Sequence, residues 1–274
     1  MRRLKKAYVE ITNVCNKSCS FCHGTKRPPR QMSDVEYERV LCELQGVTEY
    51  IYLHVLGEPL CHPQINQFIK KASQKGFKVT VTTNGTLLTD ELLDSGVYKL
   101  QISLHSFEED EGKNDYLDKI IAFSRLASEK GILVSLRLWN LTADVSNVLT
   151  EKTLERAFPK PWREGRDKSF TLAPNIFLHY AKRFEWPDTN AVDNGDSLFC
   201  YGLRDQIGIL VDGTVVPCCL DAEGDIPLGN VYKESISDIL NSPRSTAIYN
   251  RFSNRRAVEE LCRKCKYAKR FERV

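Results

Sequence analysis

The sequence lacks the features of several large classes of protein. No apolar run approaches the roughly 18–20 residues that a membrane-spanning helix needs. The N-terminal residues are basic, but polar residues follow them in place of the apolar stretch of a secretory signal. With 15 glycines and 11 prolines among 274 residues, the chain is neither collagen-like nor dominated by linkers. Its net charge of 39 − 36 = +3 is too small to argue for nucleic-acid binding.

Cysteine is absent between Cys61 and Cys200, although the chain contains ten cysteines. Three of them lie within eight residues near the N-terminus, and five lie beyond residue 199. In a chain without an export signal, clustered cysteines indicate metal binding or catalysis rather than disulfides. Cys42 is different, because it stands in an apolar stretch of a predicted helix, and we expect it to be a small buried side chain.

Strand-like and helix-like segments alternate over the first 140 residues. Strands are predicted for residues 8–11, 49–55, 77–83, 98–104 and 132–138, and helices for residues 33–44, 65–75, 89–96 and 115–130. This alternation implies a parallel sheet with right-handed helical crossovers. If this alternation continues along the chain, the strands form a full or partial (β/α) barrel. The active sites of such barrels lie at the C-terminal ends of the strands. A doubly wound open sheet is the alternative fold.

The rest of the chain is less regular. We predict a helix over residues 145–158, a sixth strand over 173–180, and short helices over 235–241 and 245–252. Residues 206–211 and 214–217 flank an Asp-Gly pair, which is a typical hairpin turn. The predicted fold class is therefore α/β. It comprises a partial (β/α)6 TIM-type barrel over residues 1–199 and a small C-terminal β-hairpin/helix extension over residues 200–274.

Three cysteines, Cys15, Cys19 and Cys22, form a C-x3-C-x2-C motif directly after the first predicted strand. Three close thiolates on a loop can ligate three corners of an iron–sulfur cluster. The fourth iron then stays open, which is the arrangement that metal-centred chemistry needs. The alternative is a zinc site completed by His23, an awkward fourth ligand because it is adjacent to Cys22.

With Phe21 in front of its third cysteine, the motif resembles the radical S-adenosylmethionine (SAM) superfamily, whose signature is C-x3-C-x-aromatic-C after the first barrel strand. The resemblance implies that the three cysteines hold a [4Fe–4S] cluster and that SAM chelates the open iron. It also implies reductive cleavage of SAM to methionine and a 5′-deoxyadenosyl radical, which abstracts a hydrogen atom from the substrate.

A second motif, Gly57-Glu58-Pro59, follows the second predicted strand. It is similar to the Gly-Gly-Glu-Pro motif of the same superfamily, whose backbone contacts the SAM amino group. Leu56 stands where the family has its first glycine. Alone, the three residues would indicate only a turn, but their place one strand after the cysteines favours the SAM-binding interpretation.

Further SAM contacts are implied at three other strands. Thr83 and Asn84 end the third strand in a sequence frequent in the family, although a plain β-turn explains them equally well. Ser103 ends the fourth strand, where family members place ribose-binding groups. Arg137 lies on the fifth strand, and an arginine inside a barrel is costly unless it is paired. The resemblance implies that it pairs with the SAM carboxylate, and a structural ion pair is the alternative.

The C-terminal cysteines resemble the SPASM/twitch extensions of radical SAM enzymes. The shorter twitch form fits this chain, and it implies one auxiliary [4Fe–4S] cluster with four cysteine ligands and a role in electron transfer. Cys219 competes with Cys218, and we prefer Cys218 because it matches a Gly-x4-Cys spacing from Gly213. A structural zinc site is the alternative. The implied ligands are Cys200, Cys218, Cys262 and Cys265.

The function implied by the resemblance is that of a radical SAM oxidoreductase or peptide-modifying enzyme. The substrate is a carbohydrate or aminocyclitol alcohol, as in the 2-deoxy-scyllo-inosamine dehydrogenase family with its similar cysteine layout, or a peptide or protein side chain. We also expect a reducing cytoplasmic location, an electron donor such as flavodoxin or ferredoxin, and neither a membrane nor a nucleic acid as partner. The alternative is a non-catalytic zinc-binding structural or nucleic-acid-interaction protein. No catalytic acid or base is identified from the sequence.

Overall fold

The computed structural model describes residues 3–109, 111–141, 146–166 and 168–271. Its strands are β1 (Lys6–Val9), β2 (Tyr50–Tyr52), β3 (Lys78–Thr83), β4 (Lys99–Ser103), β5 (Leu133–Leu141), β6 (Arg163–Glu164), β7 (Ser169–Ala173), β8 (Ile176–Lys182), β9 (Gln206–Ile209), β10 (Thr214–Val216) and β11 (Gly229–Asn230). Its α-helices are α1 (Asp34–Leu44), α2 (Ile65–Gln74), α3 (Lys113–Glu129), α4 (Val148–Ala157), α5 (Ile236–Asn241), α6 (Pro243–Ser253) and α7 (Glu260–Arg263). Short 3-10 helices are η1 (Pro59–Cys61), η2 (Asp90–Asp94), η3 (Leu104–Ser106) and η4 (Lys266–Phe271).

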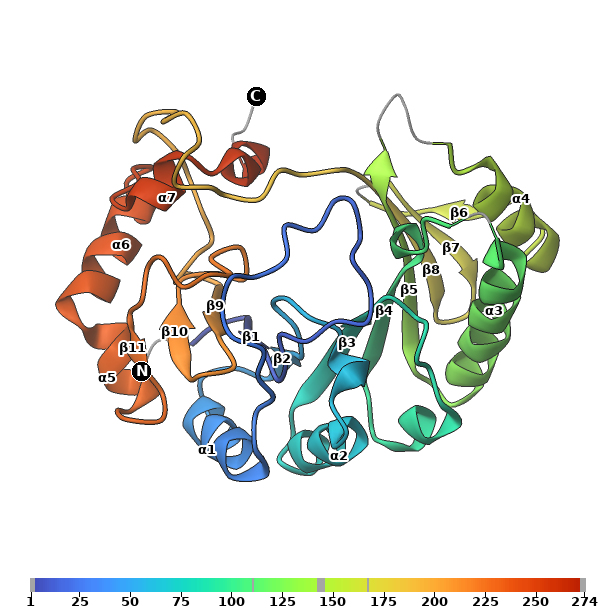
Figure 1. Cartoon of the computed structure of the whole chain (residues 1–274), viewed down its shortest axis with the longest axis horizontal. Coiled ribbons are helices and arrows are strands. Elements are labelled where there is room, and N and C mark those ends of the chain that lie inside the picture. Colours follow the sequence, from blue (N-terminus) through green and yellow to red (C-terminus); the bar gives the residue numbers. More distant parts are fainter. Residues whose placement is uncertain (1–2, 110, 142–145, 167, 272–274) are drawn as a thin grey trace.

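Within the described residues, the strands form one eleven-stranded sheet in the order β11-β10-β9-β1-β2-β3-β4-β5-β8-β7-β6. Strands β1 to β5 and β8 are parallel neighbours, which confirms the predicted partial (β/α)6 barrel. The sheet curves into an open arc with α1, α2 and α3 along its outer side (Figure 1). No helix in the described ranges is both long and apolar enough to cross a bilayer.

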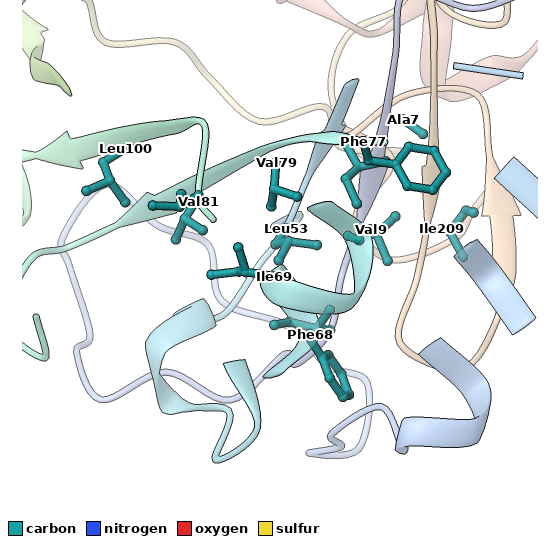
Figure 2. Close-up of a cluster of buried hydrophobic side chains, with 14 of the residues drawn as sticks. Ala7, Val9, Leu53, Phe68, Ile69, Phe77, Val79, Val81, Leu100 and Ile209 are labelled. Atoms are coloured by element: carbon teal, nitrogen blue, oxygen red, sulfur yellow. The ribbon is translucent and has the colours of Figure 1, made fainter. Parts of the chain in front are cut away.

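The outer face of the arc is apolar because alternate strand residues point toward the helices. Figure 2 shows this packing, with Val79 and Val81 of β3 close to Ile69 of α2. Phe68 of the same helix is fully buried and stacks on Tyr37 of α1, with 4.2 Å between the ring centroids. The helices are thus held on the sheet by buried apolar area, and this is what fixes the curvature of the arc.

The concave face carries the other half of each strand, and it is polar. Lys6 and Tyr8 of β1, Lys99 and Gln101 of β4, and Arg137 of β5 occupy positions between the buried apolar ones. In a closed TIM barrel these positions would be filled mainly by branched apolar side chains. A polar interior in an open arc therefore leaves room for a ligand and groups to bind it.

The C-terminal hairpin was predicted as a separate extension, and the structure shows that it also completes the sheet. Strands β9 and β10 are antiparallel, as the Asp-Gly turn predicts. Strand β9 additionally pairs in parallel with β1, from Lys6 opposite Gln206 to Val9 opposite Ile209. The hairpin therefore covers the free edge of β1, an edge that would otherwise expose unpaired backbone groups.

Several predicted boundaries and one predicted burial differ from the structure. The sixth strand is β8, and two antiparallel strands that the sequence did not predict, β7 and β6, extend the sheet beyond it. The segment predicted as a helix over residues 89–96 is the 3-10 helix η2. The predicted helix 145–158 begins at Val148, while Val145 lies outside the described residues. Cys42 is exposed, not buried, because the buried face of α1 is formed by Tyr37, Val40, Leu41 and Leu44.

Candidate active site

The three N-terminal cysteines lie on the loop after β1, at the C-terminal ends of the strands, and line a cavity of about 420 Å³. The structure brings most of the predicted SAM-binding residues to the same cavity, although they come from four different strand ends. The predicted residues on its wall are Cys15, Cys19, Cys22, Phe21, Gly57, Glu58, Thr83, Asn84 and Ser103.

The cysteine loop is held in place by contacts to the neighbouring strand ends. The backbone N–H of Glu58 donates to the carbonyl of Val14 at 2.9 Å. The Asn84 side chain donates to the side-chain oxygen of Asn16 at 2.9 Å, and the Cys19 thiol lies 3.6 Å from the carbonyl of Ser106. These contacts fix the loop from β2, β3 and β4 at once, so the cysteines are positioned by the barrel.

Gly57 is the point of closest contact between the two motif loops. Its φ is +73°, and a Cβ placed there would lie 2.5 Å from the carbonyl oxygen of Thr12 and 2.9 Å from the Cα of Asn13. Only glycine fits such an approach without displacing backbone. Leu56, which replaces the family's first glycine, donates its backbone N–H to Glu10 at 3.2 Å. This departure from the family pattern is therefore built into the local hydrogen bonding.

Glu58 connects the second motif to the end of β3. Its carboxylate is buried and accepts hydrogen bonds from the backbone N–H of Asn84 at 2.7 Å and of Leu60 at 3.1 Å. Burial raises its pKa, and these amide donors act against that rise. Pro59 is buried at the start of η1 and is not part of the cavity wall. The motif thus shapes the loop, and its exposed backbone at Gly57 faces the cavity.

Arg137 is the one predicted SAM-binding side chain whose place is unusual. It is on the concave face of β5, but it is not part of the cavity wall. Its guanidinium lies 3.4 Å from the Trp139 ring centroid and donates a long bond of 3.4 Å to Gln101. The buried Nε has no hydrogen-bond partner in the described part of the chain. Burial lowers the pKa of Arg137 to about 10, so it is still charged at neutral pH and lacks an anion.

Sequence reasoning missed several contributors to the cavity wall, His54 and Trp186 among them. His54 lies on the wall, and its buried Nδ1 has no partner among the described residues. Trp186 comes from the segment between β8 and β9, which runs from one end of the arc to the other (Figure 1). Its ring centroid lies 4.4 Å from that of His23. No motif surrounds Trp186, so only the tertiary structure could place it.

A buried ion pair behind the cavity was also missed. The carboxylate of Glu10, at the end of β1, accepts two hydrogen bonds of 2.7 Å from Arg27. It also accepts the backbone N–H groups of Leu56 and Val211, at 3.2 and 3.0 Å. Glu10 therefore joins the cysteine loop, the second motif and the C-terminal hairpin. The only sequence signal was a charged residue at the end of an apolar strand.

The C-terminal cysteines form a second, smaller cavity of about 30 Å³ with apolar walls. Cys200, Cys218, Cys262 and Cys265 all line it, as the sequence predicted for one shared ligand set. Cys219 does not line it and packs instead against the cluster that contains Tyr8 of β1. Cys218 and not Cys219 lines this cavity, and the choice of Cys218 as ligand stays a prediction.

The chemistry of this second cavity fits an iron–sulfur cluster. Burial raises the pKa of all four thiols, to about 11 for Cys200. The backbone N–H of Gly202 donates to Cys200 Sγ at 3.3 Å. Such N–H···S bonds tune cluster potentials. A bound metal group would displace the thiol protons, which makes its binding dependent on pH.

No group of three or more His, Cys, Asp or Glu side chains among residues 3–109, 111–141, 146–166 and 168–271 is already arranged to hold a metal ion. The zinc alternative is therefore neither supported nor contradicted by this arrangement.

A three-cysteine loop after the first strand of a partial barrel, together with a four-cysteine cavity behind its C-terminal hairpin, defines an iron–sulfur protein of the SAM-cleaving class. The model of the Radical SAM superfamily matches residues 9–145, which is half of the chain, and the model of the SPASM iron–sulfur cluster-binding domain matches residues 200–266. This chain belongs to the radical SAM superfamily. Membership brings SAM, a [4Fe–4S] cluster and auxiliary iron–sulfur binding.

Curated relatives match parts of the chain. The tungsten-containing aldehyde ferredoxin oxidoreductase cofactor-modifying protein of Pyrococcus furiosus is 34% identical over 95 residues, which is 33% of this chain and 26% of that protein. The antilisterial bacteriocin subtilosin biosynthesis protein AlbA of Bacillus subtilis is 24% identical over 86% of this chain and 59% of its own length. The chain thus spans between about a quarter and three fifths of these relatives.

Solved structures share the fold over nearly the whole chain. BtrN in complex with AdoMet and 2-DOIA superposes with a TM-score of 0.60 at 18% identity, covering 97% of this chain and 94% of BtrN. Streptococcus suis SuiB bound to precursor peptide SuiA superposes with a TM-score of 0.63 at 13% identity, covering 98% of this chain and 73% of SuiB. At these identities the likeness concerns the fold alone.

Proposed function

We propose that this protein cleaves SAM reductively and directs the resulting radical at a substrate held in the concave interior of its barrel. The observation that carries the proposal is the convergence of four strand ends, bearing the cysteine motif, Gly57, Asn84 and Ser103, on one cavity. When bound, the cluster and SAM supply a 5′-deoxyadenosyl radical. The chain supplies the binding, the orientation and the shielding of that chemistry.

Each group of residues has one task in this proposal. Cys15, Cys19 and Cys22 hold the cluster. The backbone at Gly57, which close packing on Thr12 and Asn13 fixes at the cavity wall, contacts the SAM amino group. Ser103 hydrogen-bonds the ribose from the end of β4. Arg137 lies on the neighbouring strand β5, opposite Ser103, and its buried Nε has no hydrogen-bond partner among the described residues. In this proposal the SAM carboxylate pairs with Arg137.

The C-terminal cysteines hold one auxiliary [4Fe–4S] cluster in this proposal. Four protein ligands leave no iron open for substrate, so its role is to pass electrons. An electron donor such as flavodoxin or ferredoxin reduces the protein, and the reducing cytoplasm is the compartment that suits both clusters. We also propose that residues 1–199 form the barrel domain and residues 200–274 the auxiliary-cluster domain. Strands of both parts belong to the same sheet.

The substrate belongs to one of two classes in this proposal. One is an alcohol of a carbohydrate or aminocyclitol, and the other is a side chain of a peptide or protein. The solved structures of similar fold include a complex with AdoMet and 2-DOIA and a complex with a precursor peptide. The polar concave face is compatible with either class, because both bring hydrogen-bonding groups into the barrel.

The test starts with anaerobic reconstitution and an assay for iron, sulfide and 5′-deoxyadenosine. We expect about eight iron and eight sulfide per chain, and 5′-deoxyadenosine when SAM and dithionite are added. Replacing Cys15, Cys19 and Cys22 with Ala leaves about four iron and no 5′-deoxyadenosine. Replacing Cys262 and Cys265 leaves about four iron with SAM cleavage retained. Fully loaded wild-type protein that forms no 5′-deoxyadenosine would overturn the proposal.

A further inference from the structure

Three cations occupy the concave face of the sheet. Lys6 begins β1, Lys99 begins β4, and Arg137 lies on β5 with its guanidinium against Trp139. Lys6 Nζ lies 5.1 and 5.2 Å from the ring centroids of Tyr8 and Tyr52, so its ammonium lies over β1 and β2. Lys99 stands in the same row of the sheet as these two rings, because Tyr8 is opposite Tyr52, Tyr52 opposite Thr80 and Thr80 opposite Lys99. Lys6 and Arg137 both contribute to the lowered pKa of Lys99, after its burial.

No carboxylate in the described part of the chain forms an ion pair with any of these three cations. Glu10, the acid at the end of β1, is already bound by Arg27 and by two backbone N–H groups. Asp205, which raises the pKa of Lys6 from a distance, is ion-paired with Lys5 at 2.7 Å. Both nearby acids are therefore occupied by other cations.

The phenols and imidazoles of the barrel strands and their loops do not supply an anion either. Burial raises the pKa of Tyr8 and of Tyr52, so both phenols are neutral at pH 7. Burial lowers the pKa of His179 and lowers that of His54 to about 3, so both imidazoles are neutral as well.

The SAM carboxylate balances only part of this charge. If Arg137 pairs with that single anion, as proposed above, Lys6 and Lys99 still leave two positive charges without a partner. Their pKa values are lowered by burial, which marks charges that the protein holds partly out of water. Holding like charges together in a half-buried site costs free energy, and an anionic ligand would recover it.

We infer that the substrate carries an anionic group, a carboxylate or a phosphate, which binds between Lys6 and Lys99 at the base of the barrel. This inference rests on the proposed function, and it names the substrate's charge. Lysine ammonium groups bind phosphate and carboxylate as point charges, and a pair of them suits an anion with several oxygens. Within the two proposed substrate classes, this selects an anionic carbohydrate derivative or an acidic peptide, since a substrate whose only charged group is an ammonium ion meets repulsion from all three cations.

The two proposed contacts on β4 lie at opposite ends of the strand. Lys99 and Ser103 are four steps apart, which spans ~13 Å between their backbones. In this inference the anion lies on the Lys99 side, and the carbon that reacts lies toward the cavity on the Ser103 side.

The test is anaerobic isothermal titration calorimetry of the reconstituted protein. Inorganic pyrophosphate is the anionic probe, and the dication putrescine is the control ligand of opposite charge. We expect wild type to bind pyrophosphate, Lys99→Met or Lys6→Met to weaken it about tenfold, and added salt to weaken it further. Lys99→Arg keeps the charge and should stay within about threefold of wild type. Lys130→Met, which removes an exposed lysine of the outer surface paired with Asp94, should leave the affinity unchanged.

The outcomes that overturn the inference are distinct from those that overturn the proposed function. Equal pyrophosphate affinity in wild type and Lys99→Met, or tighter binding of putrescine, refutes the anion site. Loss of pyrophosphate binding on saturation with SAM also refutes it, since the lysines would then belong to the SAM site. Pyrophosphate binding that persists in a protein unable to form 5′-deoxyadenosine leaves the anion site standing and removes the proposed function. Thermal unfolding of each variant checks that it is folded.

Discussion

The buried ion pair of Glu10 and Arg27 connects the cysteine loop to the C-terminal hairpin, and the effect of removing it can be predicted. The Glu10 side chain is fully buried, and that of Arg27 is 14% exposed. All four hydrogen bonds to the Glu10 carboxylate come from segments that bear the candidate sites: the cysteine loop, Leu56 beside Gly57, and Val211 in the hairpin. Removing this one charge should therefore loosen three segments together.

The substitution Glu10→Gln keeps the shape and removes the charge. One carboxylate oxygen becomes an NH2 group that faces N–H donors, and the Arg27 guanidinium keeps its charge in a buried place. Breaking a buried pair on one side typically costs about 3–5 kcal/mol, out of a total stability of about 5–15 kcal/mol. The exposed pair of Arg3 and Glu49, whose side chains are 70% and 55% exposed, should contribute less than about 1 kcal/mol.

The assay is chemical unfolding of Glu10→Gln and of the matched surface control Glu49→Gln, followed by cluster reconstitution of both. We expect Glu10→Gln to lose about 3 kcal/mol and to incorporate less iron, and the double variant Glu10→Gln/Arg27→Gln to lose less than the sum of the single variants. A cost for Glu10→Gln as small as that for Glu49→Gln would refute the reasoning. So would a fully additive double variant, because it would mean that the pair is not coupled.

Three further predictions concern single side chains. Cys218→Ser should abolish auxiliary iron binding and Cys219→Ser should retain it, as measured by iron content and electron paramagnetic resonance; the reverse result would exchange their roles. Gly57→Ala should weaken SAM binding and destabilise the protein, because the added Cβ would lie 2.5 Å from the Thr12 carbonyl; unchanged SAM affinity by equilibrium dialysis would contradict this. His54 has its pKa lowered to about 3 by burial, so the folded state binds fewer protons than the unfolded state below pH 6.5. Stability should therefore fall as pH drops from 6.5 toward 3, by at most a few kcal/mol, and His54→Gln should flatten that fall in pH-dependent unfolding; an unchanged slope would contradict the assignment.

Much of the fold was readable from local patterns. The strands of the first half alternate apolar and polar residues or are bounded by turn residues, and each reappears within a few positions of its predicted place. The helix predicted over residues 33–44 is α1, and Ser33 and Glu36 form a capping box at its start. Cys42 was misjudged because an apolar neighbourhood in sequence does not say which side of a helix a residue occupies.

The ligand sets were read from spacing, but their surroundings were not. A loop such as the one bearing Cys15 carries its own motif, so chemistry and position appear together in the sequence. Trp186 and the Glu10–Arg27 pair depend on contacts between residues far apart in the chain, and no local pattern signals such contacts. The same holds for the pairing of β9 with β1, since an edge strand accepts any partner of suitable register.

The sequence by itself determined the class of this protein, because cysteine spacing, strand alternation and turn residues are local and each has a direct chemical consequence. Only the tertiary structure decided which side chains share a space. It placed Cys218 but not Cys219 on the wall of the second cavity, and it left Arg137 off the wall of the first. It also set Lys6, Lys99 and Arg137 on one face of the sheet, where none of the described carboxylates pairs with them. The physical reason is that burial and electrostatic interaction depend on distances through space, which the folded sheet sets and the order of residues along the chain does not.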